Sequence, residues 1–257
     1  MISAGIDCGA KNTKTVIMKE GNIVAAASVP TGFDHGKAVE ECLEKALKAA
    51  GLSESDLSRI GVTGSGKGSI RRATKVVSEI SAMGKGARHF FPYARTVADV
   101  GAEDGRAAKL DEKGNAVDFA VNEKCAAGAG AFIEAMARAL DTSIEDMGRL
   151  ALQSQRKIPM NAQCVVFAES EAVGLIHART EKKDISKAIH DAMASRIVSM
   201  IRRIGVNPDV VVLGGVGHNP GLVEAMKRQL GLEKLHVPEE PEYGTAVGAA
   251  IVAAEEG

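Results

Sequence analysis

Residues 4–10 read Ala-Gly-Ile-Asp-Cys-Gly-Ala, and residues 96–102 read Thr-Val-Ala-Asp-Val-Gly-Ala. In both stretches a short apolar run, typical of a β-strand, ends in an Asp that is followed two positions later by a Gly. A Gly-Asn pair follows each stretch, at residues 21–22 and 114–115, and predicts a hairpin turn. Two such features in the same order are better explained by a duplicated unit than by coincidence. The sequence therefore predicts two related halves, each of which opens with a β-meander.

The composition is that of an ordinary globular protein with one large domain or two smaller ones. Of its 257 residues, 45% are hydrophobic and 25% are charged, and the net charge is −1, which argues against long disorder and against a basic duplex-binding surface. Aromatic residues make up only 3%, so platforms for base stacking are not expected. The longest apolar candidate, residues 245–254, is too short to span a membrane, and no signal peptide is expected. We therefore expect a cytoplasmic protein without a nucleic-acid or membrane partner, whose four Cys residues form no disulfides.

The remaining elements follow from periodicity. The first meander is followed by an expected helix over 36–50, a strand over 59–63 and helical material over about 69–88. The second half is more helical, with helices expected at about 130–140, 143–153, from 164 onward, 184–204, 220–230 and 244–254, and strands at 209–213 and 235–238. The pattern indicates an α/β protein. We predict a first domain over residues 1–97, a second over 98–243, and a last helix, 244–257, that packs back on the first domain.

The two Asp-x-Gly turns suit a magnesium–phosphate site. A carboxylate at a strand end, Asp7 or Asp99, can hold hydrated Mg²⁺, and the glycines that follow let backbone N–H groups approach phosphate oxygens. Two lysines just beyond the first turn, Lys11 and Lys14, would neutralise phosphate charge. The alternative is that each Asp only caps a turn. Because the turn is duplicated, we favour a phosphate site between the two halves.

A second glycine-rich turn follows the strand over residues 209–213. Gly214 and Gly215 present no side-chain bulk, which suits a flat ligand such as adenine. A strand–turn–helix unit that only needs tight packing explains the same residues equally well. The sequence leaves these two interpretations open.

Two of the four cysteines each precede a predicted helix. A thiol at a helix N-terminus has a lowered pKa, and the thiolate is the form that binds iron, which makes Cys125 and Cys164 candidate ligands. Cys8 lies in the first phosphate turn and Cys42 on an apolar helix stripe, so both are interpreted as buried structural residues. Two thiolates do not complete a four-thiolate cluster, so a second subunit would have to supply the other two. The alternative is a pair of inert buried thiols.

These motifs together resemble those of a known superfamily. The duplicated Asp-x-Gly turns and Leu213-Gly214-Gly215 resemble the phosphate and adenosine motifs of sugar kinases, Hsp70 and actin. Residues 122–130, Asn-Glu-Lys-Cys-Ala-Ala-Gly-Ala-Gly, and 164–171, Cys-Val-Val-Phe-Ala-Glu-Ser-Glu, look like the cluster-binding segments of one branch. That branch contains the activators of 2-hydroxyacyl-CoA dehydratases and the ATP-binding subunits of class I benzoyl-CoA reductase. Residues 160–164 and 183–196 look closest to the reductase subunits.

The resemblance implies an α/β fold of two actin-like, ribonuclease H-like ATPase domains with ATP or ADP and Mg²⁺ in the cleft between them. It implies an electron activator in which a [4Fe-4S] cluster is shared by two subunits, each supplying Cys125 and Cys164. The implied partners are that second ATPase subunit, a ferredoxin-type donor, and a catalytic acyl-CoA enzyme, with a benzoyl-CoA reductase ranked before a 2-hydroxyacyl-CoA dehydratase. The catalytic residues implied are Asp7, Asp99 and Glu103, and the nucleotide-binding residues are Gly9, Ala10, Lys11, Asn12, Lys14, Gly101, Gly214 and Gly215.

The chain departs from the family pattern at several positions. Glu103 stands where activators commonly carry Gln, so a water-orienting role does not transfer directly, and a Glu there would act as a base or bind metal. The loop at residues 81–85 lacks the usual His. Two other functions fit the same fold: a small-molecule kinase, which the absence of an acidic residue in 63–68 disfavours, and a nucleotide-switched scaffold, which would not need two helix-starting cysteines.

Overall fold

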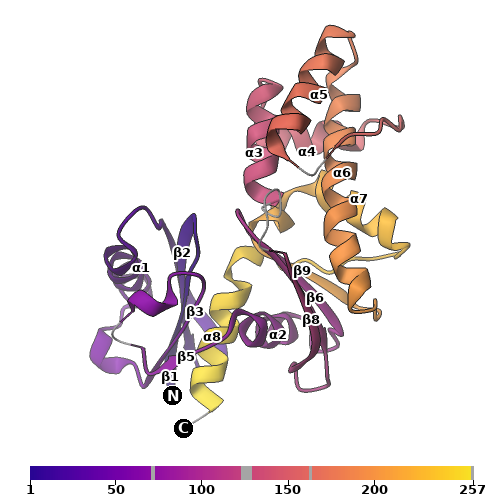
Figure 1. The fold of residues 1–257 in the computed structure, drawn as a ribbon. Helices are drawn as coiled ribbons and strands as arrows, with labels where there is room; N and C mark the ends of the chain where they lie inside the picture. Colours follow the sequence, from indigo (N-terminus) through magenta and orange to yellow (C-terminus); the bar gives the residue numbers. More distant parts are fainter. Residues whose placement is uncertain (71–72, 123–128, 162–163, 256–257) are drawn as a thin grey trace.

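The computed structural model describes residues 1–70, 73–122, 129–161 and 164–255. Two β-sheets lie side by side with two helices between them, and a group of helices extends from the far end of the second sheet (Figure 1). Each sheet is built around a β-meander, as the duplicated sequence predicts. No helix of the described ranges is both long enough and apolar enough to span a membrane.

The first sheet has the order β3-β2-β1-β4-β5. Strands β1 (Ile2–Cys8), β2 (Asn12–Lys19) and β3 (Asn22–Pro30) form the antiparallel meander, and β4 (Arg59–Thr63) and β5 (Lys75–Val76) add in parallel. Helix α1 (His35–Ala50) covers one face with its buried apolar stripe. It begins at Asp34, whose side chain accepts a hydrogen bond from Lys37 N–H, and ends at Gly51 in the left-handed conformation.

The second sheet repeats this arrangement in the order β8-β7-β6-β9. Strands β6 (Thr96–Val100), β7 (Gly105–Leu110) and β8 (Ala116–Asn122) form the meander, and β9 (Val210–Leu213) lies parallel to β6. The relation of β9 to β6 is that of β4 to β1, so the duplication extends beyond the two meanders.

The helices of the second half build the largest core. They are α3 (Ala129–Ala139), α4 (Ile144–Leu152), α5 (Val165–His177), α6 (Lys182–Arg203) and α7 (Pro220–Leu230). The core joins one face of the second sheet to the buried stripe of α6, with Phe132, Met193 and Leu222 among its fully buried side chains. Helices α3 and α5 project beyond the sheet (Figure 1).

Two helices join the halves. Helix α8 (Gly244–Glu255) packs on β1 and β4 of the first sheet, and α2 (Glu79–Phe90) packs both on α8 and on the second sheet. The approach is close because small residues line it: a Cβ added at Gly248 would lie 1.7 Å from the carbonyl oxygen of Ala82. The C-terminal helix is therefore part of the first half in space.

Three local expectations were wrong. Residues 75–76 form strand β5 and helix α2 begins only at Glu79, so the expected helical stretch over 69–88 starts about ten residues later than predicted. The expected strand at 235–238 is reduced to a single bridge between Val211 and His236. Cys8 is the last residue of β1, fully buried, and not part of the turn itself.

Candidate functional site

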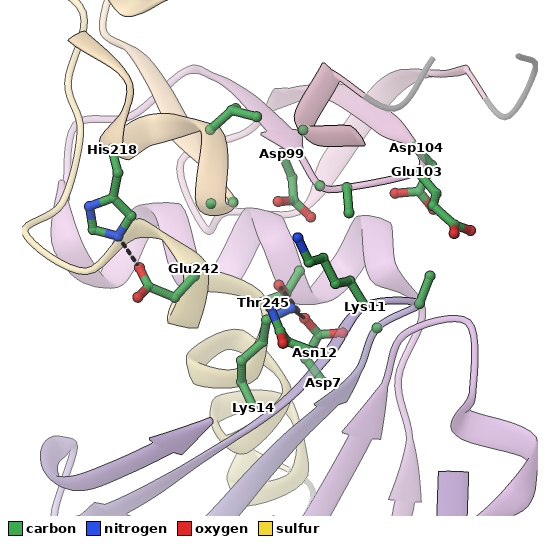
Figure 2. A pocket seen from close by; sticks show the side chains of 18 of the residues that line it. Asp7, Lys11, Asn12, Lys14, Asp99, Glu103, Asp104, His218, Glu242 and Thr245 are labelled. Atoms are coloured by element: carbon green, nitrogen blue, oxygen red, sulfur yellow. Dashed lines mark hydrogen bonds and ion pairs between the residues drawn. The ribbon is translucent and has the colours of Figure 1, made fainter. Parts of the chain in front are cut away.

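A cavity of about 660 Å³ lies between the two halves and is lined by residues of both. Figure 2 shows Asp7 and Lys14 of the first half and Asp99 of the second directed into it. The structure brings all the described candidates for nucleotide and magnesium binding to this one cavity: Asp7, Gly9, Ala10, Lys11, Asn12, Lys14, Asp99, Gly101, Glu103, Gly214 and Gly215.

Asp7 is placed by strand β1 and held by its neighbours. Lys14 lies directly opposite on β2, and its Nζ donates to Asp7 Oδ2 at 3.1 Å. Thr245, in the first turn of α8, lies 3.4 Å from the same oxygen. Burial lowers the pKa of Lys14, but the charge of Asp7 and its hydrogen bond oppose burial, and the net shift of the Lys14 pKa is upward.

Asp99 holds the equivalent position on β6. Arg106 lies opposite on β7, and its Nη1 is 4.0 Å from Asp99 Oδ2. The guanidinium also donates two hydrogen bonds, of 3.1 and 2.7 Å, to the carboxylate of Asp104. Burial raises the pKa of Asp99 to about 6 although Arg106 opposes the shift. The ionised form of Asp99 is therefore costly until a further cation reaches it.

A glycine packs against each of these aspartates from the neighbouring parallel strand. Gly64 follows β4 with φ +90°, and a Cβ there would lie 2.6 Å from Asp7 Oδ1. Gly214 follows β9 with φ +85°, and a Cβ there would lie 2.8 Å from Asp99 Oδ1. Only glycine meets both the left-handed backbone and the close approach, so the two halves build their carboxylate sites in the same way.

The end of the cavity beside Gly215 is polar. His218 Nε2 lies 2.7 Å from Glu242 Oε2, and this pair closes one side of the cavity (Figure 2). The amide nitrogen of Gly214 donates to the carbonyl of Pro241 at 2.9 Å, which fixes the glycine turn. Gly215 has open space at its Cβ position, as a surface for a flat ligand requires.

Charge in the cavity is strongly unbalanced. Among its described lining residues, three Lys and Arg side chains face eight carboxylates: Asp7, Glu79, Asp99, Glu103, Asp104, Glu134, Glu145 and Glu242. Each of the three cations is already paired with a carboxylate: Lys11 with Glu134, Lys14 with Asp7, and Arg106 with Asp104. The excess of negative charge disfavours an anionic ligand unless cations accompany it.

Neither Cys164 nor Cys42 is among the residues that line this cavity. Cys164 is half-buried at the N-cap of α5, with extended backbone and no capping hydrogen bond from its side chain. Cys125 lies outside the described residues. Cys42 is fully buried, its thiol 3.3 Å from two backbone carbonyl oxygens, and burial raises its pKa, as befits a structural thiol.

The sequence matches the BadF/BadG/BcrA/BcrD ATPase family over residues 4–253. The chain belongs to this family. It is 38% identical over 255 residues to the activator of lactoyl-CoA dehydratase of Anaerotignum propionicum, covering 99% of this chain and 98% of that protein. It is 31% identical over 261 residues to one of the benzoyl-CoA reductase subunits of Thauera aromatica, covering 97% of this chain and 92% of that one.

Solved structures agree with this membership. The activator of 2-hydroxyisocaproyl-CoA dehydratase from Clostridium difficile, with bound ADPNP, superposes with a TM-score of 0.92 at 35% identity, covering 100% of this chain and 95% of that one. A ROK family glucokinase from Streptomyces griseus, with a TM-score of 0.58 and 12% identity, shares the fold alone. The fold is therefore that of the actin-like ATPases, as expected.

For this family member, sequence reasoning missed several residues of the site. Arg106 follows Asp99 by seven positions, as Lys14 follows Asp7. The duplication could therefore have predicted Arg106 as the cation beside Asp99. Gly64 had the same kind of signal in its likeness to Gly214. Glu134 and Glu242 had none, because only the tertiary structure brings them to the cavity.

Proposed function

We propose that this ATPase binds ATP in the cavity between its halves and is the activator of an acyl-CoA enzyme, to which it passes a low-potential electron at the expense of ATP. The observation that carries the proposal is the pair of equivalent carboxylate–cation sites, Asp7–Lys14 and Asp99–Arg106, lining one cavity in a chain that resembles dehydratase activators throughout its length. The identities favour a 2-hydroxyacyl-CoA dehydratase as the partner and rank benzoyl-CoA reductase second, the reverse of the order that residues 160–164 suggested.

Magnesium fits the cavity. Among the described residues no three His, Cys, Asp or Glu side chains form a ready metal cage, and Mg²⁺ does not need one. It commonly retains several waters and binds through one or two carboxylates together with the phosphates of a nucleotide. Asp7 and Asp99 are the buried carboxylates available, and the surplus of negative charge favours a divalent cation beside them.

The residues around the phosphates take separate roles in hydrolysis. Lys14 and Arg106 hold Asp7 and Asp99 in place, and backbone N–H groups near Gly9 and Gly101 approach the phosphates. Glu103 is exposed on the cavity wall, where its carboxylate would accept a proton from the attacking water or bind metal. In this chain Glu103 thus takes the place of the Gln that activators commonly carry at this position.

The region around Cys164 suits a shared cluster and a second subunit. A [4Fe-4S] cluster held by Cys125 and Cys164 from each of two subunits would supply the one-electron chemistry. Helix α5, which begins at Cys164, exposes apolar side chains that a second copy or a related chain would cover: Val166, Phe167, Val173 and Ile176. A ferredoxin-type donor would reduce the cluster.

The test is made on anaerobically purified protein. We expect a broad absorbance near 400 nm from the cluster, and MgATP hydrolysis that falls at least about 100-fold in Asp7→Asn and in Asp99→Asn. Electron transfer to a purified 2-hydroxyacyl-CoA dehydratase, followed as ATP-dependent dehydration, tests the partner. Iron-free protein with full ATPase activity would reject the electron-carrying role, and near-normal hydrolysis in both variants would reject the assignment of the turns.

A further inference from the structure

One ion pair crosses the cavity and joins the two halves. Lys11 lies in the turn between β1 and β2, and its Nζ contacts the carboxylate of Glu134 on α3, 123 residues away in the chain. Figure 2 shows the Lys11 side chain extending from the first half into the cavity. Whether these two side chains are in contact therefore depends on the distance between the halves at the place where phosphates would bind.

The Lys11 end of this pair is held by the first half. The carbonyl of Lys11 accepts a hydrogen bond of 2.9 Å from the N–H of Thr31, and the hydroxyl of Thr31 donates to the carbonyl of Gly9 at 2.7 Å. These bonds fasten the turn to the end of β3. Only the Lys11 side chain, and not its backbone, is free to exchange one partner for another.

The Glu134 end is held by the second phosphate turn. In the first turn of α3, Gly130 N–H donates to Gly101 O at 3.2 Å, and Ala131 N–H donates to Ala102 O at 3.0 Å. A Cβ added at Gly130 would lie only 3.0 Å from the Cα of Ala102, so helix and turn are in direct backbone contact. Helix α3 is therefore attached to one phosphate turn through its backbone and to the other through Glu134.

Of the three cations that line the cavity, Lys11 changes partner most easily. Its side chain is 51% exposed, against 17% for Lys14 and 13% for Arg106. Lys14 and Arg106 also pair with carboxylates of their own half, adjacent in the same sheet, whereas the partner of Lys11 comes from the opposite half. A phosphate that needs a cation competes most effectively with Glu134 for Lys11.

We propose that Glu134 is a positioning residue. It binds Lys11 until the terminal phosphate of ATP displaces it, so that the release of Lys11 from Glu134 depends on that phosphate. In the structure the pair bridges the halves. When the third phosphate takes Lys11, Glu134 is left beside phosphate charge without its counter-ion, and α3 loses its attachment to the first half. The inference rests on the proposed ATP site and adds a residue that distinguishes ATP from ADP.

A double-mutant cycle tests this competition. The dissociation constants of ADP and of the non-hydrolysable analogue ADPNP, both with Mg²⁺, are measured by calorimetry for the wild type, Glu134→Gln, Lys11→Met and the double variant. We expect Glu134→Gln to tighten ADPNP binding about threefold, within the range of an exposed ion pair, and to change ADP binding less. In the Lys11→Met background the same substitution should have a smaller effect, because there is no lysine left to release and only the repulsion between Glu134 and the phosphate is removed.

Glu145→Gln is the matched control, since Glu145 is also a carboxylate of the cavity wall, is exposed, and its removal changes the net charge equally. It should shift ADP and ADPNP binding by the same factor. An effect of Glu134→Gln that is undiminished in the Lys11→Met background, or that is equal for both nucleotides, would overturn the inference in favour of simple electrostatics. No effect at all in the wild-type background would also overturn it. A wild type that binds neither nucleotide would instead reject the proposed function, and thermal melting confirms that each variant is folded.

Discussion

Arg106 lies directly opposite Asp99 across the β6–β7 pair, seven residues later in the chain, just as Lys14 lies opposite Asp7 across β1–β2. The duplication has thus preserved a carboxylate together with the cation that balances it. The two pairs differ in geometry: Lys14 bonds Asp7 at 3.1 Å, whereas Arg106 approaches Asp99 only to 4.0 Å and is shared with Asp104. Asp99 is therefore the less well neutralised of the two, and burial raises its pKa to about 6.

Replacing Arg106 should move the acid limb of the ATPase pH profile. Arg106 lowers the pKa of Asp99 against the effect of burial, so Arg106→Met should raise that pKa above about 6. Because a protonated carboxyl does not bind Mg²⁺, hydrolysis should be lost at a pH about one unit higher than in the wild type. Steady-state phosphate release from pH 5 to pH 8 measures the limb. Arg95→Met, which breaks the Arg95–Glu112 pair at 3.1 Å, should leave it unmoved.

Asp99 should also make the nucleotide-free protein less stable as the pH rises. Its folded pKa of about 6 exceeds the ordinary value of 3.8, so between these values the native state binds the proton that the unfolded state has lost. The contribution of Asp99 to the free energy of unfolding therefore falls as the pH rises from about 3.8 to about 6, and above about pH 6 the destabilisation is complete. Relative to Asp99→Asn, the wild type should lose about 1–2 kcal/mol between pH 5 and pH 8, measured by urea unfolding. A pH-independent difference would mean that Asp99 is not buried as described.

Substitution by alanine should lower the stability at one of two adjacent glycines and weaken nucleotide binding at the other. A Cβ at Gly214 would lie 2.3 Å from the carbonyl oxygen of Val100 at φ +85°, so Gly214→Ala should cost more than about 2 kcal/mol of stability. Gly215 has open space, so Gly215→Ala should stay within about 0.5 kcal/mol of the wild type and weaken nucleotide binding instead. Chemical unfolding and nucleotide titration separate these effects. Equal stability of the two variants would contradict the strained backbone at Gly214.

The iron content of cysteine variants should distinguish the proposed cluster ligands from the structural thiol. Cys164→Ser, and likewise Cys125→Ser, should lose the bound iron of anaerobically purified protein while nucleotide titration stays near normal, because Cys164 does not line the cavity proposed for ATP. Cys42→Ser should keep its iron, since that thiol is buried between α1 and the first sheet. Normal iron in both Cys125→Ser and Cys164→Ser would reject the ligand assignment.

The elements that the sequence predicted best are those whose ends are encoded locally. Helix α7 begins at Pro220 after Asn219, whose side chain accepts from Leu222 N–H, and it ends at Gly231 in the left-handed conformation. These start and stop residues place it at 220–230, as predicted. Strand β5 has no such signal, because Lys75 and Val76 are strand residues only through their pairing with β4.

The same distinction applies to the site. The duplicated turns point to Asp7 and Asp99 from the sequence, and the cavity does contain both. Glu134 and Glu242 reach it only through contacts between distant segments, which no local pattern encodes. The boundary between residues 97 and 98 stays a prediction, and helix α2, on its N-terminal side, packs on both α8 and the second sheet.

The placement of α8 has a consequence for the order in which the protein is made. Val16 and Met18 of the first sheet are buried against Ala246, Val247 and Ala250, which are synthesised after both halves. Until that helix leaves the ribosome, one face of the N-terminal sheet has no cover and exposes apolar surface to water. The first half can therefore complete its core only after the second half has been translated.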